Sequence, residues 1–296
     1  NEMKEFIKYQ HIEKLGTTEV EGITDGECYV FPKIDGTNSS IWLGENGICC
    51  GSRKRTLSLD NDNAGFMAWA VKQENILELL STYPEITLYG EWLVPHTLKT
   101  YDDSAWRQFY VFDVVDHEGY FSYEEYTKLL DEYGIEYIPA ICKIKNPTYE
   151  RLTSYVDDNT YLIKDGLGNG EGIVIKNYDF VNRYGRITWA KVVRNDFKTM
   201  HRKSETREVT EKKIIEEAIV NEFVTESLVT KEYSKIENES GWSSKMIPRL
   251  LQTVFYELIK EECWNFVKKY KNPTINFNTL LHLTQKRTKE LLPNLF

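Results

Sequence analysis

The pattern of the chain changes near residue 196, and this change constrains the fold more than any other feature. Before it, apolar runs typical of strands recur between turns, at about 28–48, 86–93, 108–115 and 173–175. After it, apolar residues recur only at helical spacing, over about 208–229, 244–269 and 278–292. We therefore predict an α+β fold, in which a domain with a mixed, largely antiparallel sheet over residues 1–204 precedes a smaller all-helical C-terminal domain over residues 205–296.

The first part of the chain also contains helical patterns between its strands. Apolar residues at helical spacing predict one helix over about 63–80, and a second is predicted near 148–156. Ser122 with Glu125 is typical of a capping box at a helix start, and Gly134 is typical of the residue that follows a helix end. The glycine-rich run 166–170 lacks the lysine and serine of a P-loop, so we expect a loop or hairpin there.

Charge is distributed unevenly along the chain. The net charge is −9, but residues 1–180 carry 16 Lys and Arg against 31 Asp and Glu, whereas residues 181–296 carry 21 against 15. We expect contact with a phosphate backbone in the basic part. The alternative is that these lysines only form the solvent-exposed faces of helices.

Cysteine usage and hydropathy bear on the cellular compartment. The five cysteines show no paired metal-ligand spacing, and Cys49-Cys50 are adjacent on an expected strand, where they point to opposite faces. No apolar run approaches the ~20 residues that span a bilayer, and the first residues are too polar for a signal peptide. We expect a soluble, cytoplasmic protein that has no contact with a membrane and is a monomer.

The segment Phe31-Pro32-Lys33-Ile34-Asp35-Gly36-Thr37-Asn38 contains the chain's most informative motif. It places a lysine beside an Asp-Gly turn at the end of an apolar run, and enzymes that carry a nucleotide on a lysine nitrogen use such a pattern. The alternative is a β-hairpin, because Asp-Gly between strands favours a type I′ turn and would leave Lys33 on the solvated surface. The later motifs decide between these interpretations.

Five further motifs follow in a fixed order. They are Gly51-Ser52-Arg53-Lys54-Arg55, Leu88-Tyr89-Gly90-Glu91-Trp92, Phe109-Tyr110-Val111-Phe112-Asp113-Val114, Glu171-Gly172-Ile173-Val174-Ile175-Lys176 and Trp189-Ala190-Lys191-Val192-Val193. With these residues the chain resembles the covalent nucleotidyltransferases, which adenylate or guanylate a lysine. The forms around Lys33, Glu91 and Phe112 are most similar to those of ATP-dependent RNA ligases of the RNA ligase 2 type. The resemblance covers about residues 28–200 and implies the ATP-grasp-like ligase fold of this superfamily.

The resemblance implies a reaction and its partners. Lys33 would attack ATP to form lysyl-AMP, AMP would move to an RNA 5′-phosphate, and an RNA 3′-hydroxyl would displace AMP, with a role in RNA repair. Mg²⁺ would be required, and Mn²⁺ could substitute for it. The alternatives are a DNA ligase or a capping guanylyltransferase, which usually append a five-stranded barrel instead of helices, and an inactive nucleotide-binding or RNA-binding module.

The chemistry explains why basic residues must accompany Lys33. A lysine in water has a pKa near 10.4, so an attacking lysine must lose its proton first. Asp35 alone would favour the ammonium form, so positive charge must come from Mg²⁺ and from Lys176 and Lys191. Lys191 and the metal would also stabilise charge on the α-phosphate. Ile34 and Asp35 lie within the nucleophile motif and are expected to contact the nucleotide.

Three other residues take their predicted roles from the resemblance. Glu91 corresponds to a carboxylate that contacts the ribose or the metal, and Glu171 to a carboxylate that binds metal or relays a proton. Phe112 corresponds to an aromatic ring that stacks on adenine. The alternatives are surface glutamates and a core phenylalanine. Strand alternation would place Glu171 and Lys176 on opposite faces.

Arg53 and Arg55 are both candidates for the arginine that holds a 5′-phosphate or the nucleotide sugar, and a plain basic turn is the alternative. Alternation would place both on one face of a strand. Two departures from the family stand out. The second lysine of the last motif is Val193 here, with Arg194 or Lys198 as candidate replacements, and Pro32 before the nucleophile has no N–H to donate.

Overall fold

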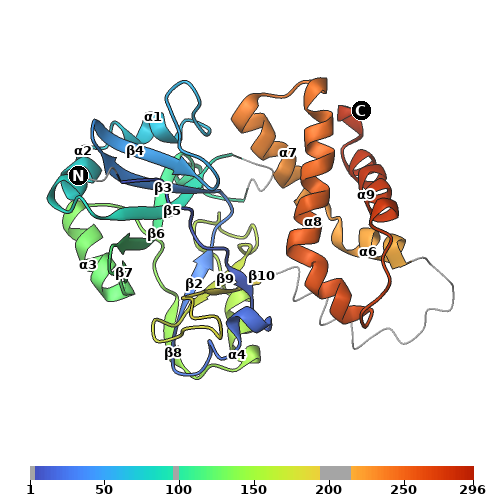
Figure 1. Ribbon diagram of the computed structural model, residues 1–296, viewed down its shortest axis with the longest axis horizontal. Coiled ribbons are helices and arrows are strands. Elements are labelled where there is room, and N and C mark those ends of the chain that lie inside the picture. Colours follow the sequence, from blue (N-terminus) through green and yellow to red (C-terminus); the bar gives the residue numbers. More distant parts are fainter. Residues whose placement is uncertain (1–3, 96–99, 194–214) are drawn as a thin grey trace. The chain divides into compact units, whose positions relative to one another are not determined.

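The computed structural model describes residues 4–95, 100–193 and 215–296. These residues form two compact units, of which one contains residues 4–94 and 100–193 and the other contains Pro95 and residues 215–296. The first unit combines two five-stranded sheets with helices, and the second consists of helices (Figure 1). The predicted α+β class with a helical C-terminal region is therefore confirmed.

The first sheet has the strand order β1-β10-β9-β2-β8. Its strands are β1 (Glu13–Lys14), β2 (Glu27–Lys33), β8 (Cys142–Lys145), β9 (Gly172–Lys176) and β10 (Ala190–Val193). Helix α4 (Tyr149–Asp157) covers one face, where alternate residues of the strands, such as Val30, Ile173 and Ile175, pack against Leu152 and Val156. Because side chains alternate between faces, the residues between these apolar ones face away from this core.

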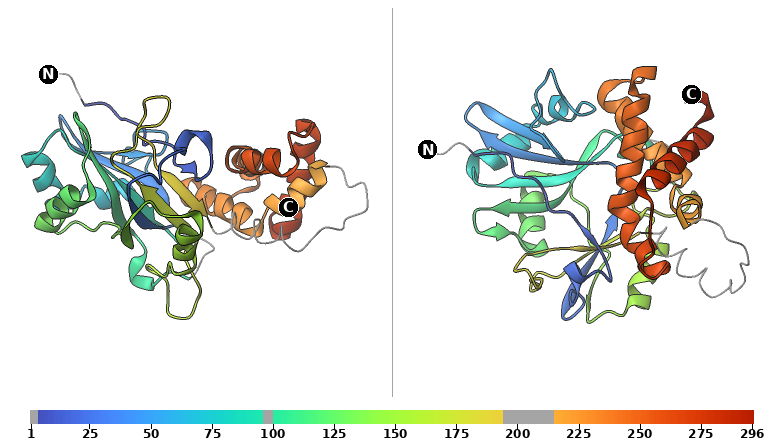
Figure 2. Two further views of the ribbon diagram at one scale, coloured as in Figure 1. Left: turned by 90° about the horizontal axis from the view of Figure 1, so that it is seen from below. Right: turned by 45° about the vertical axis from the view of Figure 1, so that its right-hand side comes forward.

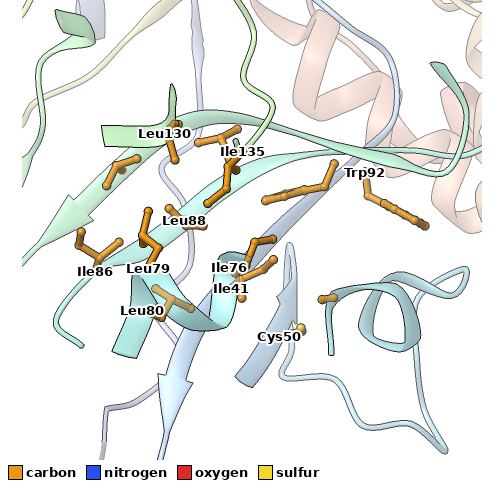
Figure 3. Close-up of a cluster of buried hydrophobic side chains, with 14 of the residues drawn as sticks. Ile41, Cys50, Ile76, Leu79, Leu80, Ile86, Leu88, Trp92, Leu130 and Ile135 are labelled. Atoms are coloured by element: carbon orange, nitrogen blue, oxygen red, sulfur yellow. The ribbon is translucent and has the colours of Figure 1, made fainter. Parts of the chain in front are cut away.

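The second sheet is antiparallel throughout and has the strand order β4-β3-β5-β6-β7. Its strands are β3 (Thr37–Gly44), β4 (Gly47–Ser52), β5 (Thr87–Leu93), β6 (Gln108–Asp116) and β7 (Gly119–Tyr120). Its core joins Ile41, Leu88 and Trp92 of the strands to the helices α1 (Phe66–Ala70), α2 (Glu74–Thr82) and α3 (Tyr123–Tyr133), as Figure 3 shows for α2 and its neighbours. Because side chains alternate along a strand, the residues between these core residues face away from the helices.

The helices and strands of this unit can be compared with the sequence predictions. The single helix expected over 63–80 is wrong, because the chain forms α1 and α2 with a turn at Val71–Gln73 between them. The cap of α3 is confirmed, since the Ser122 hydroxyl accepts the N–H of Glu125 and Gly134 adopts a left-handed conformation after the helix end. The short strands β1 and β8 were not predicted, because two to four residues carry too little periodicity.

The hairpin interpretation of the Lys33 segment is also wrong. β2 ends at Lys33 in the first sheet, and β3 begins at Thr37 in the second, so Ile34–Gly36 connects two sheets instead of two paired strands. Lys33 therefore lies at a junction between sheets.

The second unit consists of four α-helices in its described residues, drawn in orange and red in Figure 2. They are α6 (Ile215–Phe223), α7 (Glu226–Ser240), α8 (Ile247–Lys269) and α9 (Phe277–Leu291). The single helix expected over 208–229 is divided in the described part, because Thr225 caps a new helix by accepting the N–H of Leu228. The remainder of that prediction, residues 208–214, lies outside the described residues. Among the described helices none is long and apolar enough to cross a membrane.

Candidate functional site

Strand register places three predicted site lysines on one face of the first sheet. Lys33 lies opposite Gly172 of β9, and Lys191 of β10 lies opposite Val174. Directly opposed residues of antiparallel strands share a face, as do residues two apart in one strand. Lys33, Lys176 and Lys191 consequently share the face that is turned away from the core under α4.

Lys33 contacts Glu171, the carboxylate that directly precedes β9. Lys33 Nζ is 2.8 Å from Glu171 Oε2, and the two side chains are 22% and 21% exposed. Although alternation would direct Glu171 away from Lys176, Glu171 lies outside the regular strand and its carboxylate reaches the lysine at the end of β2. This contact resolves the orientation that the sequence left open.

The connection after Lys33 is held by backbone hydrogen bonds to side chains. The N–H of Asp35 donates to the Tyr101 hydroxyl at 2.9 Å, and the N–H of Gly36 donates to Glu91 Oε1 at 3.0 Å. A Cβ at Gly36 would lie 2.4 Å from the carbonyl oxygen of Trp92, so this close approach requires glycine. These bonds place the carboxylate of Glu91 beside the segment that carries the lysine.

The two residues that follow Lys33 in the chain are buried. Asp35 is 5% exposed, and Ile34 packs with Leu93 and Tyr101 in a small apolar cluster. Burial raises the pKa of the Tyr101 hydroxyl well above its usual value, and the negative charge of Asp35 adds to this shift. Tyr101 therefore remains a neutral hydrogen-bond partner of the segment.

Lys176 forms a buried ion pair that joins the two sheets. Its Nζ lies 2.8 Å from Oδ1 of Asp113 on β6, and the side chains are 2% and 0% exposed. The ammonium also donates to the carbonyl of Phe112, and its nearest aromatic ring is that of Phe31 at 4.6 Å. Burial lowers the pKa of Lys176, and the charge of Asp113 partly offsets that shift.

The carboxylate of Asp113 accepts two further hydrogen bonds. Trp189 Nε1 donates to its Oδ2 at 3.0 Å, and the Tyr9 hydroxyl donates to the same oxygen. The sequence did not identify Tyr9 or Trp189 as partners of Asp113. Tyr9 carries no local signal for this contact, because it is 104 residues away in the chain.

Phe112 occupies an irregular position in β6. Tyr89 pairs with Asp113 and Gly90 with Val111, so this register shift leaves Phe112 without a directly opposed residue. Such bulges re-aim a side chain. The ring is half-buried and lies 4.8 Å from that of Tyr9, between centroids. Phe112 is thus not a fully buried core residue.

Arg53 and Arg55 lie in a turn and not on a strand. β4 ends at Ser52, whose N–H donates to the carbonyl of Arg55 at 2.9 Å, so the expected shared strand face is wrong. Arg53 Nη2 is 3.2 Å from Nδ1 of His11, whereas Arg55 donates to the carbonyls of Asn61 and Asp62 at 2.6 and 3.1 Å. Arg55 therefore supports its own loop, whereas Arg53 is exposed and contacts His11.

Two other sequence predictions concern metal binding and the replacement of a lysine. Within the described ranges, no group of three or more His, Cys, Asp or Glu could hold a metal ion. Mg²⁺ is usually bound by one or two carboxylates together with waters and substrate phosphates, and Glu91 and Glu171 offer carboxylates of this kind. Arg194 and Lys198, the candidate replacements for a lysine at Val193, lie outside the described residues.

A comparison with models of protein families identifies one family. The model of the RNA ligase family matches residues 26–193. No curated protein matches the chain. Among solved structures, the Naegleria gruberi RNA ligase with PPi has a TM-score of 0.52 at 19% identity, over 67% of this chain and 58% of that chain.

Two other structures of the Naegleria gruberi RNA ligase give similar values. A mutant form without ligand has a TM-score of 0.51 at 19% identity, and a mutant form with ATP and Mn has 0.50 at 20% identity. Each similarity covers 66% of this chain and 58% of that chain. This chain therefore spans less than two thirds of the length of these structures, and at such identity the likeness concerns the fold.

Proposed function

The chain belongs to the RNA ligase family, and we propose that it is an ATP-dependent enzyme that joins RNA 5′-phosphate and 3′-hydroxyl ends through a lysyl-AMP intermediate. The contact between Lys33 and Glu171, on the face that also carries Lys176 and Lys191, is the observation that carries this proposal. A nucleophile, a carboxylate and further cations belong together in a site that transfers a nucleotide.

In the first step Lys33 Nζ attacks the α-phosphorus of ATP. An N–P bond forms, the bond to the bridging oxygen breaks, and pyrophosphate leaves. Glu171, at 2.8 Å, is positioned to accept the proton that the ammonium must lose. Lys191 is 8% exposed and lies on the same face, where its charge can stabilise the negative charge that develops on the phosphate oxygens.

The nucleotide base and sugar would be held by the second sheet. Phe112, with its half-buried ring, would stack on the adenine, and Glu91 would contact the ribose or the metal. Bound Mg²⁺ would neutralise phosphate charge, with Glu91 and Glu171 as its protein ligands and with Mn²⁺ able to replace it. The solved Naegleria form with ATP and Mn supports a nucleotide and a divalent metal as partners.

Two transfers complete the reaction. An oxygen of the RNA 5′-phosphate attacks the phosphorus of lysyl-AMP, the N–P bond breaks, and Lys33 regains its proton. A 3′-hydroxyl then attacks the RNA 5′-phosphorus and releases AMP while the hydroxyl loses its proton. We propose that residues 1–204 perform the adenylyl transfer, that residues 205–296 contribute RNA contacts, and that the reaction repairs broken RNA.

The test is covalent labelling of the purified protein with ATP labelled at the α-phosphate in the presence of Mg²⁺. The unchanged chain should keep label through denaturing electrophoresis, with ATP but not with GTP, and Lys33→Ala should abolish it. Lys143→Ala is the matched control, because Lys143 lies on an outer strand of the same sheet and binds Glu27 and Glu124. Equal labelling of Lys33→Ala and the control would refute the assignment of the nucleophile.

A further inference from the structure

Val193 lies where a second lysine of the last motif would contribute its charge. It is directly opposite Gly172 of β9, and Gly172 is directly opposite Lys33 of β2, so the three residues form one row across the sheet. A lysine at position 193 would therefore share the face and the row of the nucleophile. In this chain an apolar side chain occupies that place.

The strand β1 brings another lysine to the same face. Lys14 is the register partner of Lys191 in the parallel pair of β1 and β10, so the two side chains lie beside each other on neighbouring strands. Leu15, the next residue, packs against the core under α4 on the opposite face, as alternation requires. Lys14, Lys33, Lys176 and Lys191 therefore occupy a single face of this sheet.

The backbone around Lys14 is fixed on both sides. The N–H of Glu13 donates to the carbonyl of Trp189 at 3.2 Å, and the N–H of Leu15 donates to the carbonyl of Lys191 at 2.9 Å. The carbonyl of Lys14 accepts the N–H of Thr17 at 3.2 Å and its hydroxyl at 2.9 Å. The backbone that carries Lys14 is thus held beside Lys191, so less conformational freedom is lost when the two charges bind one anion.

Burial strengthens the electrostatic argument. Lys14 is 9% and Lys191 is 8% exposed, so their charges act through less water than those of surface lysines. Lys33 and Lys176 are each paired with a carboxylate. The charges of Lys14 and Lys191 add to the potential of the same face, and positive potential attracts an anion and raises its affinity. A phosphate group is the anion that a nucleotide-transferring site must bind.

We propose that Lys14 binds a phosphate group of the nucleotide together with Lys191, and so supplies the charge that the chain lacks at Val193. This inference rests on the proposed function. Lys14 precedes the segment 26–193 that matches the RNA ligase family, so its role comes from the register of β1 and not from that match.

The test compares lysine adenylation across ATP concentrations in Lys14→Met, Lys14→Arg and the control Lys143→Met. Methionine keeps an unbranched apolar stem but removes the charge. Because a hydrogen bond to a charged group is lost, Lys14→Met should raise the ATP concentration needed for half-maximal labelling by roughly 10-fold to 100-fold. Lys14→Arg and Lys143→Met should stay within about threefold of the unchanged chain.

A second variant separates lost charge from lost structure. Adding Val193→Lys to Lys14→Met returns a lysine to the row of Lys33. If the loss was electrostatic, the double variant should bind ATP at least about tenfold more tightly than Lys14→Met alone. Thermal melting of each variant checks folding. A Lys14→Met protein that melts normally and labels like the parent would overturn the proposal, as would a loss that Val193→Lys leaves uncorrected.

The source of the phosphate is tested by measuring the sealing of RNA ends with the same variants. Normal adenylation by Lys14→Met combined with poor sealing would assign Lys14 to the RNA 5′-phosphate and would contradict the nucleotide assignment. An unchanged chain that forms no adduct with ATP would instead refute the proposed function itself. The two failures are therefore distinguishable.

Discussion

At the scale of single residues, Phe112 shows how a predicted role can be separated from packing. The ring is half-buried at a register shift, whereas Phe66 is a fully buried core residue of the same unit. If Phe112 stacks on adenine, Phe112→Ala should weaken ATP binding by about 1–3 kcal/mol. Phe66→Ala should instead cost about 3–5 kcal/mol of unfolding free energy.

The measurements for this prediction are thermal melting and the ATP dependence of adduct formation. Phe112→Ala should melt close to the unchanged chain, with a shifted ATP dependence. A large loss of melting temperature with an unchanged ATP dependence would instead identify Phe112 as a structural residue.

The ion pair of Lys176 and Asp113 leads to a second prediction. Lys176→Met removes one partner of a buried pair and leaves the carboxylate with the donors Trp189 and Tyr9 alone. Because an uncompensated charge then stays buried, the free energy of unfolding should fall by about 3–5 kcal/mol in urea denaturation. The exposed Lys143→Met should change it by less than about 1 kcal/mol. Similar losses in both variants would show that the pair contributes little.

The site residues also show where sequence reasoning ends. The motifs around Lys33 and Glu171 placed these residues in one site, and the structure brings the two side chains into contact. Tyr9 could not be predicted, because its partner is far away in the chain and nothing local marks it. The supposed strand face of Arg53 and Arg55 failed because a turn after Ser52 interrupts the alternation. The catalytic roles of all these site residues stay predictions.

At the scale of elements, the strength of local signals decided what could be predicted. α3 combines a capping serine, amphipathic spacing and a glycine in a left-handed conformation, and its bounds follow from these residues. β1 has only two residues and forms a strand because it pairs with β10, a tertiary contact that no local sequence pattern predicts. The same limit explains why the chain between β2 and β3 resembled a hairpin, since sheet membership depends on distant strands.

The cap of α3 supplies a prediction about an element. Ser122→Ala removes the hydroxyl that accepts the N–H of Glu125 at 3.3 Å, so one donor of the first turn loses its partner. In Ser122→Ala the unfolding free energy should fall by about 1 kcal/mol. Ser122→Asp should retain most of the stability that the cap contributes. Urea denaturation measures both variants. Equal losses in the two would mean that the cap does not stabilise the helix.

At the scale of the whole molecule, the boundary between the acidic and the basic part of the chain does not coincide with the boundary between the two units. The helical unit is not uniformly basic, because residues 215–262 carry 5 Lys and Arg against 10 Asp and Glu, whereas residues 263–289 carry 6 against none. The positive charge of the described helical unit is thus concentrated in the end of α8, the following loop and α9. If this unit contacts RNA, these residues are where phosphates would be neutralised.

A shortened chain tests whether the helical unit is needed for RNA. A protein of residues 1–204 keeps every predicted site residue, so it should still form the adduct with ATP while losing most sealing of RNA ends. Sealing at the parental rate would instead give the helical unit a role in stability or partner binding. Circular dichroism and melting should accompany the assay, because the unit could also support folding.

The last prediction uses the full chain and its charge distribution. Lys268, Lys271 and Lys286 are exposed in the basic part of the helical unit, and their combined substitution by Gln removes three positive charges without shortening the protein. If all three contact phosphates of single-stranded RNA, the slope of log affinity against log salt should become shallower by about 2, since each contact contributes about 0.7. Adenylation should not change, because its ligand is the nucleotide. The matched control replaces the exposed Lys72, Lys128 and Lys145 of the sheet unit, which should leave the slope as it was. A common slope in the two triple variants and the parent would show that RNA does not bind through the basic part of the helical unit.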